Sequence, residues 1–108
     1  MKIALSTLAL AFCTLAASSL SHAQNTPAQA LYVRGLAATC ANCHGTDGKV
    51  ASGSSVLSIA GMEKNYIETQ LKAFKSGTRP ATVMHQISKG FSDTQIEVLA
   101  GYFAAQKK

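Results

Sequence analysis

Long apolar runs, basic clusters and aromatic residues are scarce in this sequence. After residue 23, no apolar run approaches the roughly 18 residues that a membrane span needs. Aromatic residues make up 6% of the chain, and the lysines are scattered, which argues against a nucleic-acid surface. No alternating strand pattern, repeat or linker is present. These absences predict a single all-α domain that inserts stably into no membrane and binds no nucleic acid.

The length of 108 residues excludes a large multi-layer enzyme and favours a carrier or binding module. The chain is therefore predicted to be no enzyme. An apolar core in so small a domain is marginal by itself, so a disulfide, a metal, a cofactor or a partner is expected to support it.

The first residues have the pattern of a secretory signal peptide. Lys2 precedes an apolar stretch over residues 3–17, and Ser21-His22-Ala23 is a small-x-small cleavage pattern. We expect residues 1–23 to be removed, together with Cys13, and residues 24–108 to form a periplasmic domain. The alternative is an uncleaved anchor over residues 3–20, but serine and threonine interrupt it and no basic cluster follows.

Apolar spacing predicts helices over residues 28–39 and 63–75, with a short helical turn within residues 81–89. Ser92 and Gln95 form a capping-box pattern that begins a last helix, and its apolar residues repeat at helical spacing as far as Phe103. Residues 45–61 are rich in glycine and serine and predict a long loop, of the kind that wraps a ligand.

Five consecutive residues, 40–44, read CANCH and carry the strongest chemical signal. Cys40 and Cys43 can each form a thioether to one haem, and His44 directly after them can bind its iron. The motif predicts one covalently attached haem c, which also supplies the apolar body that a small domain needs.

Three other interpretations of the motif remain open. A redox-active dithiol is expected at the start of a helix after a strand, whereas this motif closes a helix. A structural disulfide across two residues would be strained and would leave His44 unexplained. A zinc site would need a fourth ligand, for which only His85 is available.

The sixth iron ligand has to come from Met62, Met84, His85, water or nothing. Met62 stands at the start of a helix and is read as a core residue. Met84 lies on the last irregular segment before the final helix, where the chain can return across the opposite haem face. We therefore predict His44 and Met84 as the metal ligands, which suits electron transfer, and place His85 at the surface or behind the ligands.

These segments resemble the class I cytochromes c of bacteria. Residues 40–48 resemble the family's attachment segment, residues 84–93 its stretch from the axial methionine, and residues 96–103 its aromatic-ended last helix. The resemblance implies three main helices wrapped around one haem, with the first and last helices crossing so that Leu36 contacts Tyr102 or Phe103. Many relatives place a proline carbonyl toward the haem histidine, and Ser54 is taken to stand at that position.

Residues 74–87 are similar to a narrower group, the cytochrome subunits of flavocytochrome c sulfide dehydrogenases. This similarity implies a haem subunit that accepts electrons from a flavoprotein. The alternatives are a diffusible cytochrome serving a terminal oxidase or reductase, and a haem protein with an open distal site.

Lysine and arginine outnumber aspartate and glutamate by 10 to 5, which favours docking onto an acidic protein surface. The candidates for a docking rim, each of which could equally be a solvated helix face, are Lys49, Lys64, Lys72, Lys75, Arg79 and Lys89. Arg79 is also a candidate partner for a haem propionate.

Overall fold

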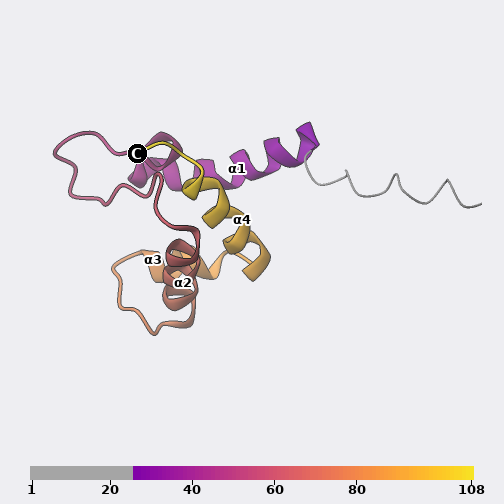
Figure 1. The fold of residues 1–108 in the computed structure, drawn as a ribbon. Coiled ribbons are helices and arrows are strands. Elements are labelled where there is room, and N and C mark those ends of the chain that lie inside the picture. Colours follow the sequence, from indigo (N-terminus) through magenta and orange to yellow (C-terminus); the bar gives the residue numbers. More distant parts are fainter. Residues whose placement is uncertain (1–25) are drawn as a thin grey trace, which may run out of the picture.

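The computed structural model describes residues 26–108, so the predicted signal segment, with Cys13 and His22, lies outside the described residues. Within them the regular structure is helical and contains no strand, which confirms the all-α class. Figure 1 shows the order of the helices α1 (Pro27–His44), α2 (Lys64–Ser76), α3 (Met84–Lys89) and α4 (Asp93–Ala104), with a 3-10 turn, η1, at Thr46–Gly48. No helix in this part of the chain is long and apolar enough to cross a membrane.

Helix α1 is longer than its sequence pattern predicts. It begins after Thr26, whose side chain accepts a hydrogen bond from the Gln29 amide, and it continues through the CANCH motif to His44. Gly45 ends it at φ 76°, where a Cβ atom would lie 2.0 Å from the Lys49 carbonyl oxygen. Only glycine fits that turn. The apolar spacing had predicted an end near residue 39, but the end is set by this backbone contact.

Side chains at their first turns fix the starts of α2 and α4. The Glu63 carboxylate accepts hydrogen bonds from the amides of Asn65 and Tyr66. At α4, Ser92 accepts from the Gln95 amide while the Gln95 side chain accepts from the Ser92 amide, which confirms the predicted capping box. These bonds satisfy amides that have no partner inside the helix.

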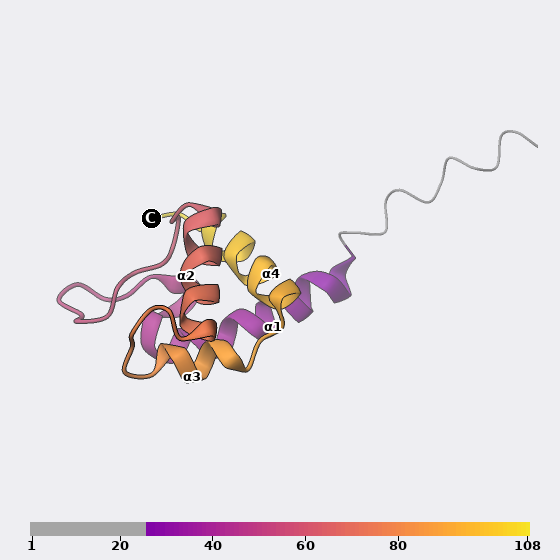
Figure 2. The ribbon, with the colours of Figure 1, turned by 90° about the horizontal axis from the view of Figure 1, so that it is seen from below.

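The core is small and lies where α1, α2 and α4 meet. Its buried cluster consists of Ala37, Ile67, Leu99, Ala100 and Phe103. Figure 2 shows α1 crossing α4 and α3 lying against the end of α2. The alanines let the helices approach closely at their crossing.

Leu36 and Tyr102 both pack against this cluster, and Phe103 is part of it. The predicted contact between the first and last helices is therefore present.

Candidate functional site

An apolar cleft opens beside the core and is bordered by all four helices. It holds about 920 Å³ of space free of protein atoms, including the part open to solvent. Its lining comprises Cys40, His44, Leu57, Ile59, Met62, Tyr66, Ile67, Gln70, Leu71, Phe74, Arg79, Met84, Ile87, Phe91, Leu99 and Phe103. Such a wall excludes water and suits a large apolar ligand with few polar groups.

The two cysteines of the motif lie on the last turns of α1. Cys40 lines the cleft and packs against the core, whereas Cys43 is exposed and does not line the cleft. Their spacing of three residues places them on the same side of the helix. Burial raises the pKa of the Cys40 thiol, and the Cys43 thiol beside it acts in the same direction, against the hydrogen bond from Thr39.

The structure also bears on the other interpretations of the motif. Cys40 and Cys43 are both free, so they form no disulfide here. Among residues 26–108, no three His, Cys, Asp or Glu side chains come together to hold a metal ion, as a zinc site would need. The motif closes α1, as predicted, and does not begin a helix where a reactive dithiol is expected.

The ring of His44 is oriented by a single backbone contact. Its Nδ1 atom lies 2.7 Å from the carbonyl oxygen of Leu57. A carbonyl can only accept, so Nδ1 donates the hydrogen bond, and in the neutral tautomer that fits this contact Nε2 keeps its lone pair. Nε2 is the atom that can bind iron, and the second nitrogen fixes the tautomer and the ring orientation.

This acceptor corrects the expectation for Ser54. The carbonyl comes from Leu57, three residues later along the loop. Ser54 instead lies in an exposed turn, where its amide donates to the Ala51 carbonyl and its hydroxyl accepts from the Val56 amide. A backbone carbonyl leaves no mark in the sequence when the residue that carries it is not proline, so sequence reasoning could not find Leu57.

Met84 lines the cleft, but as the first residue of α3 and not in an irregular segment. Met62 lines the cleft as well, and it also packs against the buried core cluster, as a core residue does. Met84 is not among the side chains packed against that cluster.

His85 is half-buried and does not line the cleft. Its Nδ1 atom is buried and has no hydrogen-bond partner within residues 26–108. The residue is therefore partly covered and lies outside the cleft lining.

Arg79 lines the cleft beside two residues of α2. Its guanidinium donates to the Gln70 side chain and lies 4.5 Å from the centre of the Phe74 ring. These contacts hold a permanent positive charge at the wall of an otherwise apolar cleft, which suits an anionic group on a ligand.

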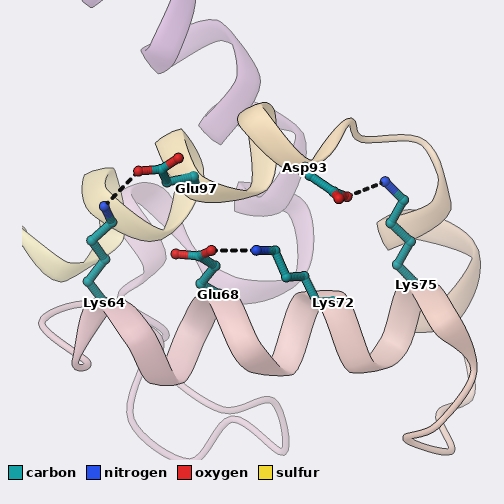
Figure 3. A network of polar contacts seen from close by, with 6 residues as sticks. All are labelled: Lys64, Glu68, Lys72, Lys75, Asp93 and Glu97. Atoms are coloured by element: carbon teal, nitrogen blue, oxygen red, sulfur yellow. Dashed lines mark hydrogen bonds and ion pairs between the residues drawn. The ribbon is translucent and has the colours of Figure 1, made fainter.

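Three of the six candidate docking cations are already paired. Figure 3 shows Lys64 with Glu97 at 3.2 Å, Lys72 with Glu68 at 2.6 Å and Lys75 with Asp93 at 2.7 Å, on α2 and α4. Hydrogen bonding to Glu68 raises the pKa of Lys72, and the bond from Lys75 lowers the pKa of Asp93. Lys49 and Lys89 make no ion pair within residues 26–108.

A second contact that the sequence did not reveal joins α4 to the turn after His44. The Tyr102 hydroxyl donates to the carboxylate of Asp47, a residue held at a positive φ of 56°. This hydrogen bond raises the pKa of Tyr102, because a phenolate beside a carboxylate would be repelled. The contact ties the end of the motif to the last helix.

Taken together, the residues around the cleft fit a covalently attached haem. The cleft has an apolar wall, a thiol and an imidazole at one end of α1, and a thioether from α3. Sulfur and imidazole nitrogen are the donors that haem iron accepts in electron carriers. The structure brings together Cys40, His44 and Met84 of the predicted site residues, with Cys43 exposed on the same helix.

Comparison with known proteins finds several relatives, including the following three. The chain is 45% identical to the cytochrome subunit of sulfide dehydrogenase from Chlorobaculum tepidum, over 68% of this chain and 64% of that subunit. It is 37% identical to a thiosulfate dehydrogenase electron acceptor from Thiomonas intermedia, over 62% of this chain and 32% of the relative. It is 33% identical to cytochrome c-554(548) from Halomonas halodenitrificans, over 64% of this chain and 86% of the relative.

The chain thus spans less than two thirds of the first two relatives and most of the third. No protein-family model matches it.

Proposed function

Because the chain belongs to the class I c-type cytochromes, we propose that it is an exported monohaem electron carrier whose haem iron is bound by His44 and Met84. The family carries covalently bound haem c, so the chain carries haem c as well. The haem, when bound, accepts and releases one electron at its iron. The relatives carry the names of cytochromes and electron acceptors, and the chain itself transforms no substrate.

Each site residue has a separate task in this proposal. Cys40 and Cys43 hold the group covalently from one side of α1, and the raised pKa of Cys40 keeps its thiol protonated until attachment. His44 presents Nε2, and Met84 presents its thioether from α3. The apolar wall excludes water, and Arg79 is placed to meet a propionate.

The observation that carries the proposal is the orientation of His44. The hydrogen bond to the Leu57 carbonyl makes Nδ1 the donor, so that Nε2 can bind a metal. The ring lines an apolar cleft, where a histidine that serves only to be hydrated would not be needed. A histidine kept for packing or solubility would need neither a fixed tautomer nor an apolar cavity.

We further propose that electrons arrive from a flavoprotein sulfide dehydrogenase. The support is the 45% identity with a sulfide dehydrogenase cytochrome subunit, together with the resemblance of residues 74–87 to that group. A second candidate is a free, diffusible carrier for an oxidase or reductase. It is favoured by the similarity to cytochrome c-554(548), which spans most of that small protein.

Native mass spectrometry of the protein purified from its own periplasm at low salt tests these proposals together. The expected species begins near Gln24, carries one covalent haem and is bound to a larger flavin-containing subunit, and its haem is reduced when sulfide is added. The same haem-bearing chain alone, unaffected by sulfide, would favour the diffusible carrier. A chain without covalent haem would contradict both candidates.

A further inference from the structure

The carbonyl of Gly48 is a point at which the long loop is fastened. It accepts the Ile59 amide at 2.8 Å, the Ala60 amide at 3.1 Å and the Ser58 hydroxyl at 2.9 Å. Gly48 is buried, and a Cβ atom there would lie 2.7 Å from Ile59 and 2.8 Å from Phe103. The loop is therefore held against the turn that follows His44.

Ser58, the first of the three residues that donate to the Gly48 carbonyl, directly follows Leu57. Ser58 supplies the hydroxyl, and the peptide that joins it to Leu57 contains the carbonyl that accepts from His44. Leu57 is 59% exposed and lines the cleft. The position of the carbonyl thus depends on the contacts of the residue after it.

We propose that Ser58 is a positioning residue for the haem ligand His44: its hydroxyl, bound to the Gly48 carbonyl, holds the Leu57 carbonyl on Nδ1. The inference rests on the proposed function, because it assumes that His44 binds the iron. The two amides of Ile59 and Ala60 keep the loop attached without Ser58, so loss of the hydroxyl loosens the Leu57 peptide and leaves the fold intact.

Loss of the Ser58 hydroxyl is expected to shift the reduction potential of the haem in one direction. A short hydrogen bond from Nδ1 makes the imidazole a stronger donor, which favours ferric iron and lowers the reduction potential. Loosening the Leu57 carbonyl weakens that bond. Removing the Ser58 hydroxyl is therefore expected to raise the potential.

Hydrogen exchange of the His44 Nδ1 proton measures the contact directly. The haem-loaded protein is labelled with nitrogen-15 in histidine and followed by NMR in the diamagnetic ferrous state. In Ser58→Ala the Nδ1 proton is expected to exchange about fivefold faster than in the wild type, since one neutral hydrogen bond is lost. The midpoint potential of the same sample is expected to rise.

Two variants serve as controls. Ser58→Thr keeps the hydroxyl and is expected to exchange within about twofold of the wild type. Ser55→Ala removes an exposed hydroxyl from the same loop that makes no side-chain hydrogen bond within residues 26–108, and it is expected to change nothing. Backbone amides of α4 report on global opening and are expected to keep their wild-type rates in all three variants.

Two results would overturn the positioning role: an unchanged Nδ1 exchange rate in Ser58→Ala, or an equal acceleration of the α4 amides, which would mean a general loss of stability. A different observation tests the assignment of His44 as an iron ligand. If the ferric wild-type protein shows no iron-shifted resonances from the His44 ring, His44 does not bind the iron, and both proposals fall whatever Ser58 does.

Discussion

At the scale of single residues, the side chains of the site can be recognised in the sequence, but the backbone atom that orients His44 cannot. That His44 and Met84 would lie at the cleft was predictable, His44 from its place after the second cysteine and Met84 from its place before the last helix. The partner of His44 was not, because its acceptor is the backbone of Leu57 and any residue has a carbonyl. The structure also distinguishes the two methionines of the cleft, because Met62 packs against the buried core cluster and Met84 is not among the residues that do so.

Met84 is expected to be the sixth ligand, and Met62 a packing residue. Met84→Leu should abolish the iron–thioether charge-transfer absorption of the ferric protein and let the ferrous protein bind carbon monoxide rapidly. Met84→His should restore a sixth ligand and lower the midpoint potential, as bis-histidine ligation does.

Met62→Leu is the matched control for this assignment, with His85→Gln as a second. Met62→Leu should keep the charge-transfer absorption and lose less than about 1.5 kcal/mol of stability, as a swap of similar volume does. If the absorption disappears in Met62→Leu and survives in Met84→Leu, the two roles are reversed.

Tyr102 is expected to stabilise the turn after His44 in a pH-dependent way. Its pKa in the folded protein is raised above the ordinary value of 10.0 by the hydrogen bond to Asp47, so the contribution is complete below about pH 10 and is lost as the pH rises through the folded-state pKa. Because Tyr102 is only partly buried, Tyr102→Phe should cost no more than about 1 kcal/mol at pH 7.

Urea unfolding of the haem-loaded protein between pH 7 and 11 checks this expectation. The stabilities of the wild type and Tyr102→Phe should converge at the alkaline end, whereas Tyr66→Phe, whose hydroxyl has no hydrogen-bond partner within residues 26–108, should follow the wild type throughout. A gap that stays constant or widens with pH would contradict the role given to Asp47.

At the scale of elements, the helices were predictable where side chains define them and less so where the backbone does. The capping box begins α4 at the expected residue, and the apolar spacing of α2 gave its limits to within a residue at each end. The end of α1 was missed by five residues, since its last turns carry the motif and not an apolar stripe. The short α3 was expected only as a turn, and its first residue proved to be Met84.

The capping box is expected to contribute measurably to the stability of α4. Ser92→Ala leaves the Gln95 amide without its acceptor and should cost about 1 kcal/mol in the free energy of unfolding. Thr94→Ala, at an exposed position two residues later without a side-chain hydrogen bond, should be neutral or slightly stabilising. Equal losses in chemical denaturation of the two variants would show that the cap contributes nothing specific.

At the scale of the whole molecule, the excess of positive charge is not spread evenly over the surface. On α2 the lysines 64, 72 and 75 are paired with carboxylates, so that face is close to neutral. Lys49, in the loop after the motif, and Lys89, at the end of α3, are on elements that border the cleft and are unpaired within residues 26–108. A negatively charged redox partner is therefore expected to be attracted more strongly by these two lysines than by the three paired lysines of α2.

This asymmetry predicts a difference between two double variants. Lys49→Gln with Lys89→Gln should slow electron exchange with hexacyanoferrate, a small anionic probe, by about three- to tenfold at low ionic strength. Lys64→Gln with Glu97→Gln removes a pair that carries no net charge, and it should slow the exchange by less than about twofold. The difference should vanish in high salt, and equal slowing by the two pairs in stopped-flow measurements would refute it.

The cleft also has a consequence for the chain before its haem is attached. It borders all four helices, and its walls include large side chains such as Leu71, Phe74 and Phe91 that are only partly covered by the small core. In a chain without haem, this apolar surface stays accessible to proteases and chaperones. Attachment covers the surface and removes the recognition signal in the same event. We therefore expect the chain without haem to be degraded faster than the haem-loaded chain.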